Sequence, residues 1–396
     1  MCSSARRVLH FAGPPGGGLD GGAMRRLRIC HLITTLGVGG AERGLWELCR
    51  RMDRRRFDVR VVGLRGGAVQ RWLAEADVPV AVLGVRGKWD AGKLRPLVEL
   101  LRAGAVDVLH THLFHADLAG RAAAPAAGVR HVVHTVWTAE GRWRPWQFAW
   151  ARLAKRACDR IVCVSESVRE HHARRSGLPA GCYTVIPWGV DTEAFRRDAA
   201  ARRRLRRQWG LGKDDVLAAF VGRLEFYKGV ETLLTAAERL GPRGNVHVAI
   251  AGDGPQRPIV ERFVDRAGGG GRVRYLGHVE DIPALLSAAD LYVMPSLWEG
   301  WPLALGEAMS AGLPAIGSDV AGIRDLIVPG ETGLRVPSKD PAALAEAISA
   351  LAGDRARRQA FGRAGRKRIV EGFSIETTVR AHEELYDEVA GTCPGD

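Results

Sequence analysis

The strongest constraint on the fold is an alternation of short apolar runs with helical patterns, repeated along most of the chain. In the first half, runs such as RLRICHLI and FDVRVVGL are typical of strands, and segments such as GLWELCRRM are typical of helices. A second series begins at VLAAFVGR and continues through VHVAIAGDGP and LYVMPS. Strands that alternate with helices form parallel sheets. We therefore expect an α/β protein with two doubly wound, Rossmann-like domains that face a cleft.

The length of the chain fits this division. Its 396 residues are enough for two domains, because single domains cluster near ~100–200 residues. An arginine-dense stretch, RRDAAARRRLRRQWGLGKDD, interrupts the alternation and is interpreted as the link between the domains. The predicted divisions are a disordered extension at 1–24, a first domain at 25–195, an interdomain segment at 196–213, a second domain at 214–372, and a helix at 373–390 that packs back on the first domain.

The net charge of +14 is carried by the first half of the chain alone. Residues 1–200 hold 32 Lys and Arg against 18 Asp and Glu, whereas residues 201–396 hold 26 against 26. Such an imbalance suggests a surface that faces an anionic partner, for example a membrane leaflet, a lipid phosphate or nucleic acid. No recognised nucleic-acid-binding module is present, so nucleic acid is not expected. A non-catalytic protein that binds an anionic surface or nucleic acid stays open as a different class of function.

Targeting and redox features favour a cytoplasmic protein, associated at most with the inner face of a membrane. No apolar run approaches the ~18 residues of a membrane-spanning helix. The seven cysteines are scattered without a C-x-x-C spacing, which argues against a disulfide framework or a zinc site. The N-terminal FAGPPGGGLDGGA takes the place of the apolar core of a secretory signal.

Two loops of the second half suggest a ligand site, because ligands bind beyond the carboxyl ends of strands in a doubly wound sheet. The loop VGRLEFYKGVETLL places Arg223 and Lys228 just after a strand. A guanidinium fork and an ammonium can share the charge of a diphosphate. The IAGDGP turn places Gly252 and Gly254 on the same rim, where we expect them to form a wall for a nucleobase.

The stretch PSLWEGWPLALGEAMSAGLP, at 295–314, opens a helix. Pro302 suits the first helical position, which leaves the N–H groups of Trp301, Leu303 and Ala304 unpaired. A helix end of this kind attracts phosphate.

The same stretch carries two carboxylates with different positions. Glu299 lies in the loop before the helix, whereas Glu307 lies inside it, so the two are expected to do different jobs. Glu307 could accept hydrogen bonds from the hydroxyls of a ribose, and Glu299 could contact a second, reacting sugar. The alternative from the residues alone is that Glu307 supports the helix surface and Glu299 caps the helix.

In the first domain, the glycine loop LGVGGAERG and the segment VLHTHLFHAD follow strands. The loop places Gly39 and Gly40 at a strand end but lacks G-x-G-x-x-G, so NAD binding is not predicted. His110, His112 and His115 lie near a strand end without a carboxylate or cysteine to complete a ligand set, so no metal site is predicted.

These loops, together with SDVAGIRDLI and GETGLRVP, resemble the retaining GT-B glycosyltransferases of family four, the glycosyl transferases group 1. Glu299 and Glu307 match the E-x7-E element of that family. The resemblance covers roughly residues 25 to 390 and is closer in the second half. It implies that the first domain lies on the acceptor side and that the second binds a nucleotide sugar.

The resemblance also implies roles for individual residues. Arg223 and Lys228 would bind the donor diphosphate, Glu307 the ribose, and Glu299 the donor sugar near its reacting centre, while His112 would touch that sugar through its side chain or carbonyl. The catalytic group is therefore Glu299, His112, Lys228 and Arg223. The rest of the implied donor-binding set is Gly39, Gly40, Gly252, Gly254, Val279, Gly300, Trp301, Leu303 and Ala304.

The implied reaction moves a sugar from a nucleotide-diphosphate donor, a UDP- or GDP-sugar, to a hydroxyl acceptor with retention of configuration. The acceptor would be a glycan, a polysaccharide intermediate or a lipid-linked molecule. No metal and no further cofactor is expected, because Arg223, Lys228 and the helix end can neutralise the departing diphosphate. No carboxylate of the first domain stands out as an inverting base. Within the same fold, a nucleotide-sugar epimerase or a phosphorylase remains the enzymatic alternative.

Two features of the first domain bear on the acceptor. Trp137 and Trp188 stand where relatives often carry histidine and asparagine, so the acceptor is less constrained by the family than the donor. The segment GRWRPWQFAWARLAKRACDR is a basic amphipathic stripe whose later half is expected to pack on the sheet. Its entry, with Trp143 and Trp146, could touch a membrane interface or a lipid-linked acceptor.

Overall fold

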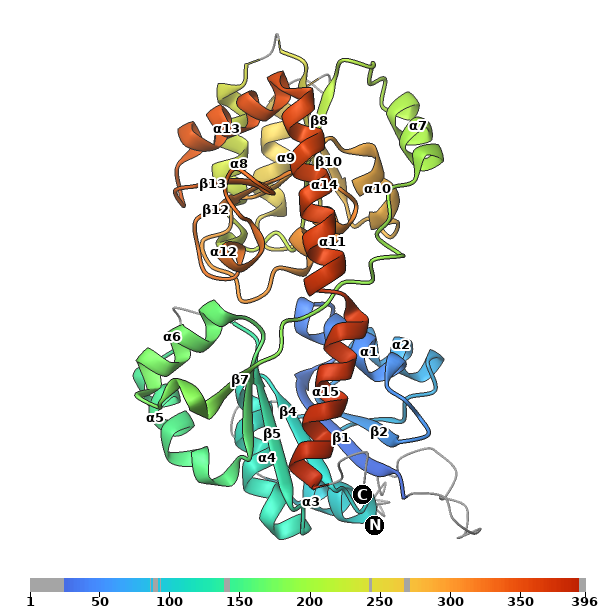
Figure 1. Ribbon diagram of the computed structural model, residues 1–396, viewed down its shortest axis with the longest axis vertical. Coiled ribbons are helices and arrows are strands. Elements are labelled where there is room, and N and C mark those ends of the chain that lie inside the picture. The colour runs from blue at the N-terminus through green and yellow to red at the C-terminus, as the bar shows by residue number, and fades with distance from the viewer. Residues whose placement is uncertain are drawn as a thin grey trace, which may run out of the picture.

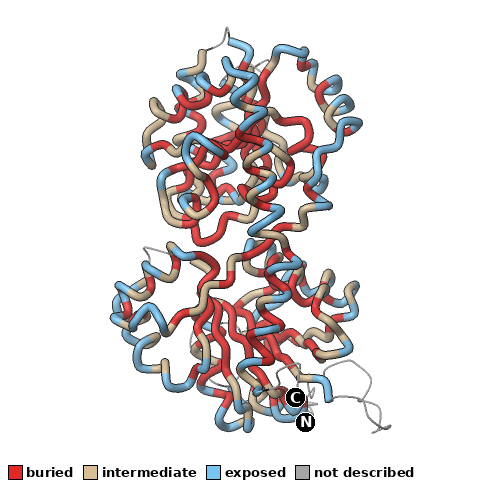
Figure 2. The backbone as a smooth tube through the Cα atoms, viewed as in Figure 1, coloured by how far each residue is buried: buried red, intermediate tan, exposed pale blue. Residues whose placement is uncertain are grey.

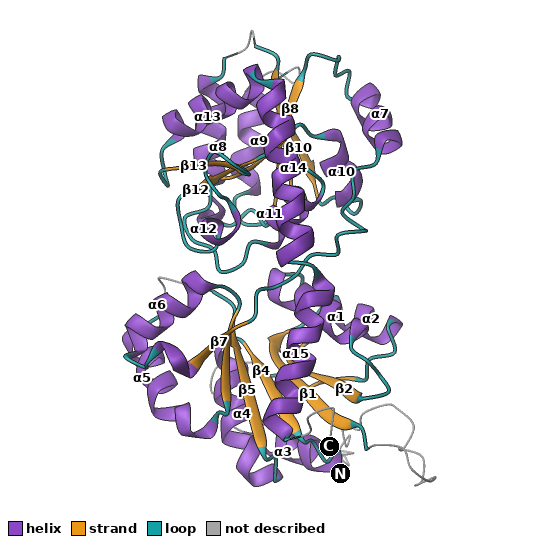
Figure 3. Cartoon of the chain, in the orientation of Figure 1, coloured by secondary structure: helices purple, strands orange, loops and turns teal. Residues whose placement is uncertain are grey.

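The computed structural model describes residues 25–391, apart from 86, 88–91, 93, 139–142, 242–243 and 267–270. The extension predicted at 1–24 lies outside the described residues. The chain forms two lobes stacked along the long axis, each built on one parallel sheet (Figure 1). Helices lie on both sides of each sheet (Figure 3). The predicted α/β architecture with two doubly wound sheets is confirmed.

The N-terminal lobe is built on a seven-stranded sheet with the order β3-β2-β1-β4-β5-β6-β7. β4 is buried at every residue, as expected for a parallel strand covered on both faces, and Figure 2 shows the strands of this sheet largely in the buried class. Its strands are β1 (Leu27–Thr35), β2 (Phe57–Arg65), β3 (Val80–Val82), β4 (Val108–His112), β5 (His131–Val136), β6 (Arg160–Cys163) and β7 (Tyr183–Val185). Its helices are α1 (Gly40–Arg51), α2 (Val69–Glu75), α3 (Leu94–Ala103), α4 (Phe114–Ala127), α5 (Pro145–Leu153) and α6 (Glu166–Ser176).

The C-terminal lobe is built on a six-stranded sheet with the order β10-β9-β8-β11-β12-β13. Its strands are β8 (Val216–Val221), β9 (Val246–Ala251), β10 (Val273–Gly277), β11 (Leu291–Met294), β12 (Ala315–Ser318) and β13 (Gly333–Val336). The helices that follow along the chain are α7 (Ala199–Gln208), α8 (Val230–Arg239), α9 (Arg257–Arg266), α10 (Ile282–Ala288), α11 (Leu303–Ser310), α12 (Ile323–Leu326), α13 (Pro341–Gly353), α14 (Arg355–Gly372) and α15 (Ile375–Ala390).

Both strand orders reverse at one position. In the first sheet the reversal falls between β1 and β4, and in the second between β8 and β11. Connections leave in opposite directions from such a switch point, which opens a crevice at the carboxyl ends of the two strands. The loops singled out in the sequence after β1, β4, β8 and β11 all begin at these points.

The arginine-dense segment at 196–213 contains α7, which packs on α10 of the C-terminal lobe. Arg202 and Arg206 hold the carboxylate of Asp290, at 2.6 and 2.7 Å. Asp290 also accepts the backbone N–H of Leu217 at the start of β8. The arginines of this segment therefore attach α7 to the second sheet. The proposed domain boundaries themselves stay a prediction.

The chain crosses between the lobes twice, and the two crossings lie side by side. The N–H of Val190 donates to the carbonyl of Phe373 at 2.9 Å, and the carbonyl of Val190 accepts the N–H of Ile375 at 2.9 Å. Beyond this point α15 runs along the N-terminal lobe, whereas α14 lies on the C-terminal lobe (Figure 1). The hydroxyl of Tyr386 on α15 reaches a ring nitrogen of His110 at 2.6 Å, so α15 is tied to the centre of the first sheet.

The basic amphipathic segment folds as α5 and differs from the prediction in its later half. Phe148 is buried, but Leu153 is 79% exposed and Trp146 is 53% exposed. The helix therefore buries one narrow edge and presents a tryptophan and a leucine to the outside. In the described part of the chain, no helix is both long enough and apolar enough to cross a membrane.

Candidate active site

The loops at the two switch points meet between the lobes. A Cβ added to Gly300 would lie 1.9 Å from the carbonyl oxygen of Trp137, so only glycine allows the loop after β11 to approach the loop after β5 this closely. The hydroxyl of Ser165 donates to the carbonyl of Gly300 at 3.0 Å. A Cβ on Gly40 would lie 3.8 Å from Leu303. The structure thus brings together predicted residues from both halves of the sequence.

Lys228 and Glu299 form a buried ion pair at the centre of this arrangement. The Nζ of Lys228 lies 2.7 Å from Oε1 of Glu299, and the two side chains are only 15% and 8% exposed. Gly229, with φ of 69°, lets the Lys228 turn approach the strand end, because a Cβ there would lie 2.0 Å from the carbonyl of Pro295. Two predicted catalytic residues are therefore brought into contact. With little water around it, the Lys228 ammonium would attract a phosphate strongly, and the Glu299 carboxylate beside it would oppose that attraction.

Arg223 differs from Lys228 in its surroundings. Its side chain is 58% exposed and pairs with Glu225 at 2.8 Å, two residues further along the loop. The guanidinium stands at the mouth of the site, whereas the Lys228 ammonium lies inside it.

Close packing of the IAGDGP turn against a neighbouring loop requires glycine at two of its positions. A Cβ on Gly252 would lie 1.8 Å from the carbonyl of Gly222, and one on Gly254 would lie 2.8 Å from that of Leu224. Their φ angles of 137° and 157° also favour glycine. The turn is therefore fixed against the loop that carries Arg223, which places both loops on one rim. Val279, after β10, is half-buried against the core.

Helix α11 begins one residue later than predicted. Pro302 is its N-cap, with a non-helical ψ of 89°, and Leu303 is the first helical residue. The N–H groups of Leu303 and Ala304 still lie in the first turn of α11, where no helical carbonyl precedes them, so this helix end can still bind a phosphate. Trp301 is buried, so its ring supports the loop from inside.

Glu307 pairs with a residue of the other lobe. Its Oε1 lies 3.0 Å from Nη2 of Arg43 on α1, and its side chain is 6% exposed. Burial raises the pKa of Glu307, and the charge of Arg43 opposes that shift. The carboxylate predicted to bind a ribose therefore links the two lobes in this structure, and a ribose at this position has to share it with Arg43 or displace that side chain.

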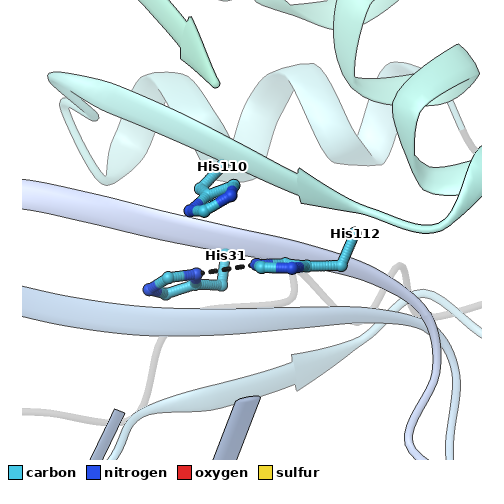
Figure 4. Close-up of side chains that lie close together, drawn as sticks. All are labelled: His31, His110 and His112. Atoms are coloured by element: carbon cyan, nitrogen blue, oxygen red, sulfur yellow. Dashed lines mark hydrogen bonds between the residues drawn. The ribbon is translucent and has the colours of Figure 1, made fainter. Parts of the chain in front are cut away.

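Three histidines meet beneath the site (Figure 4). His110 and His112 lie on β4, and His31 comes from β1, while His115 is not part of the cluster. Sequence reasoning missed His31. The parallel register that pairs His31 with His110 is the signal that would have found it. One nitrogen from each ring lies within 4.8 Å of the others, but both nitrogens of His110 are already engaged, with Tyr386 and Thr135.

A hydrogen-bond chain fixes the protonation of His112. The indole N–H of Trp137 can only donate, and it reaches Nδ1 of His112 at 3.3 Å. A neutral His112 then carries its proton on Nε2 and donates to Nδ1 of His31, at 3.0 Å. Burial holds the pKa of His112 well below its ordinary value, which keeps the ring neutral. Both ring nitrogens are therefore used, so a sugar contact by the side chain requires this chain of bonds to break.

The two tryptophans that depart from the family pattern touch each other. The ring centroids of Trp137 and Trp188 lie 4.3 Å apart. Trp188 in turn fills the space above α1, where a Cβ on Gly44 would lie 2.5 Å from its Nε1. Trp137, Trp188 and Gly44 therefore form one packing unit in the N-terminal lobe.

Glu42 is a carboxylate that sequence reasoning missed. It lies in the first turn of α1 and is 8% exposed, and a Cβ on Gly39 would lie 2.4 Å from its Oε2. Burial raises the pKa of Glu42, and the charge of Arg223 from the opposite lobe acts against this shift. The expectation that no carboxylate of the first domain stands out as an inverting base stays a prediction, and Glu42 is the residue at which to test it. The available signal was an acidic residue two positions after the glycine pair.

Comparison with known proteins matches this arrangement to one family. Residues 38–194 match the model described as Glycosyltransferase Family 4, and residues 201–368 match that of Glycosyl transferases group 1. Alpha-maltose-1-phosphate synthase of Mycolicibacterium smegmatis is 30% identical over 313 residues, which cover 73% of this chain and 80% of that protein. The chain belongs to the group 1 glycosyltransferases.

Two further relatives match nearly the whole length of this glycosyltransferase. The UDP-Gal:alpha-D-GlcNAc-diphosphoundecaprenol alpha-1,3-galactosyltransferase of Escherichia coli is 27% identical over 375 residues, covering 91% of this chain and 97% of that one. The crystal structure of Anabaena HepE in complex with UDP-glucose shares the fold, with a TM-score of 0.82 at 22% identity, over 92% of this chain and all of that one. The predicted family is therefore confirmed.

Proposed function

We propose that this glycosyltransferase moves a sugar from a nucleotide-diphosphate donor to a hydroxyl acceptor with retention of the anomeric configuration. The observation that carries the proposal is the buried Lys228–Glu299 pair at the C-terminal switch point, beside the open end of α11. A UDP-sugar is the first donor to test, because the Escherichia coli relative is named for UDP-Gal and HepE was solved with UDP-glucose. A GDP-sugar is the second.

The charges of the site suit the departure of a diphosphate. As the bond between the sugar and the phosphate breaks, negative charge grows on the leaving oxygen. Lys228 is held inside the site, Arg223 stands at its mouth, and the first-turn N–H groups of α11 add a positive dipole end. These groups act without a metal, so we propose that chelators leave the activity unchanged.

Glu299 is proposed to position Lys228 and the donor sugar. One of its oxygens already accepts from Lys228, which keeps the carboxylate paired instead of free to attack. Retention then follows if the acceptor hydroxyl attacks from the face that the phosphate leaves and passes its proton to that phosphate. Under this proposal no protein nucleophile takes part.

The acceptor is proposed to be lipid-linked or part of a growing glycan, with the first lobe near a membrane. Support comes from α5, whose exposed Trp146 and Leu153 stand among arginines, a combination suited to headgroup depth. Vesicles of phosphatidylcholine and phosphatidylglycerol should retain the protein at low salt and release it at high salt. Replacing both Trp146 and Leu153 with alanine should abolish that retention, and unchanged flotation of this variant would remove α5 from the proposal.

The test of the proposed reaction is incubation of the purified protein with a panel of nucleotide sugars and candidate acceptors. Release of a nucleoside diphosphate together with a new glycosidic bond supports transfer. Conversion of the donor without nucleotide release would indicate an epimerase, and release of a sugar phosphate would indicate a phosphorylase. Proton NMR of the product gives its anomeric configuration. An inverted product, together with loss of activity in Glu42→Gln, would contradict the same-face mechanism. It would instead indicate that Glu42 of the first lobe acts as a general base.

A further inference from the structure

A basic cavity lies at the end of the N-terminal lobe that faces away from the active site. It has a volume of about 460 Å³ and is lined by Arg25, Arg26, Arg28 and Arg130, together with Asp107. β1 starts at this cavity and ends at the glycine loop of the active site, so the two sites occupy opposite ends of one strand (Figure 1). The cavity therefore cannot be an extension of the donor site.

One carboxylate organises half of the guanidinium groups. Arg28 donates to both oxygens of Asp107 at 3.0 Å, and Arg25 donates to one of them at 2.6 Å. Among the described residues, Arg26 and Arg130 have no acidic partner, and Arg26 reaches only the carbonyl of Arg54 at 3.4 Å. The wall thus carries four positive groups against one negative group.

The ordinary explanation for such arginines is that they offset helix ends. α3, α4 and α15 all end close to this wall, at Ala103, Ala127 and Ala390, and Arg102 already donates to a carbonyl at the end of α4. Three helix ends supply at most about 1.5 negative charges in total. The surplus of positive charge is larger than that, so the helix ends do not account for all of it.

We propose that this cavity binds a small organic phosphate, namely a phosphate ester on a body about the size of glycerol or a sugar. The guanidinium groups of Arg26 and Arg130, which have no acidic partner in the described part of the chain, suit the phosphate, because planar forks bind its oxygens in pairs. Leu27, Val106 and Ala390 line the same wall and provide apolar contacts for the uncharged part of the ligand. The volume lies in the ~300–1,000 Å³ range of small-molecule sites.

The ligand could be a free phosphate ester or the headgroup of a phospholipid, since both present the same chemistry. The proposal does not depend on the proposed sugar transfer. It gives a specific location to part of the positive charge that the first half of the sequence concentrates.

The experiment measures binding of glycerol 3-phosphate to the full chain by calorimetry, with saturating UDP present to occupy the donor site. The test variant is Arg26→Ala combined with Arg130→Ala. The matched control is Arg203→Ala combined with Arg207→Ala, which removes the same charge from the exposed face of α7. Flotation with vesicles of phosphatidylcholine, with and without phosphatidylglycerol, is run on all three proteins, and UDP binding serves as the check of folding.

Saturable binding that is about tenfold or more weaker in the cavity variant, and unchanged in the α7 variant, supports the proposal. If vesicle retention also falls in the cavity variant, the source is a lipid headgroup, and if retention is unaffected, the source is a free phosphate. Absence of saturable binding to the wild type, or equal affinity in both double variants, overturns the proposal. Because UDP binding and sugar transfer are measured separately, failure here is distinct from failure of the proposed function.

Discussion

The two lobes contribute to the active site by different physical means. In the C-terminal lobe the predicted groups are charged and paired with each other or with a neighbour, as in Lys228–Glu299 and Arg223–Glu225. In the N-terminal lobe the groups beneath the site are neutral and connected by hydrogen bonds, as in the chain from the half-buried Trp137 through the fully buried His112 to His31. The charged pairs of the candidate site are therefore concentrated in the C-terminal lobe, whereas burial keeps the histidines beneath it in the N-terminal lobe neutral.

The largest effect should come from acidifying the buried histidines beneath the site. Burial lowers the pKa of His31 to about 3 and those of His110 and His112 well below the usual 6.5. It also lowers to about 4 the pKa of His382, a buried residue of α15 whose ring centroid lies 5.8 Å from that of His110. Unfolded histidines take up protons near 6.5, so this stability is complete above that pH and is lost as the pH falls. A histidine that is neutral in the fold and protonated in the unfolded chain lowers the free energy of unfolding by about 1.4 kcal/mol per pH unit, from pH 6.5 down to its folded pKa.

Urea unfolding at a series of pH values measures this slope. The buried Glu42 and Glu307 act in the opposite direction, because their raised pKa values favour the fold below the ordinary 4.5 and that contribution is lost as the pH rises through them. Because four histidines oppose two acids, the free energy of unfolding should fall as the pH falls below 6.5. His382→Asn should make the slope shallower, while His278→Asn, at an exposed position, should not. A free energy of unfolding that stays constant below pH 6.5 would refute the neutral state of these histidines.

The next largest effect should come from the C-terminal lobe, through Lys228→Ala. Loss of the ammonium removes charge stabilisation that matters most as the diphosphate departs, so kcat should fall by ~10²–10³-fold. Lys213→Ala removes an exposed lysine of the same lobe and should leave kcat unchanged. Steady-state kinetics distinguishes the cases, and a Lys228→Ala enzyme with weaker donor binding but wild-type kcat would show that the charge acts on the ground state only.

Glu307→Gln sharpens the comparison where the lobes touch. If Glu307 holds the ribose, this isosteric change should weaken UDP binding by about tenfold with a smaller effect on kcat. Arg43→Gln breaks the same interlobe ion pair but leaves the carboxylate in place, so it should bind UDP at least as tightly as the wild type. Equal losses in the two variants, measured by calorimetry, would assign Glu307 to the junction between the lobes instead of to the nucleoside.

The smallest effect should come from Trp137→Phe. The change keeps an aromatic ring beside Trp188 but removes the N–H that His112 accepts, so the free energy of unfolding should fall by ~1 kcal/mol. Trp188→Phe breaks no such bond, because the described residues offer its indole nitrogen no partner, but it leaves a cavity in the fully buried space above α1 and should cost more. Denaturant unfolding of Trp137→Phe checks the prediction, and a free energy of unfolding equal to that of the wild type would contradict the proposed hydrogen-bond chain.

The same division separates what the sequence could predict from what it could not. The strand–helix alternation and the glycine-punctuated loops after strands are local features, so the two sheets and the meeting of the loops followed from them. The partners within the site depend on register and side-chain direction. His31 faces His110 only because β1 and β4 pair in parallel, and Glu42 turns under Gly39 only because α1 starts there. The first relation joins residues far apart in the sequence, and the second, although local, depends on the residue at which α1 begins.

The α5 segment shows the limit of periodicity in a different way. Tryptophans at helical spacing predicted an apolar face packed on the sheet, yet Phe148 alone of its residues is buried and Leu153 is 79% exposed. A basic amphipathic stripe has the same period whether its apolar residues face a core or an outside partner, so the pattern alone could not decide between them.

We have proposed that the diphosphate of the donor binds at the C-terminal switch point. The structure of the protein with UDP bound tests this proposal. We predict that the phosphates lie against the first turn of α11, with Nζ of Lys228 in hydrogen-bond contact with a phosphate oxygen. UDP located elsewhere, with Lys228 still bonded only to Glu299 and the end of α11 empty, would contradict the account.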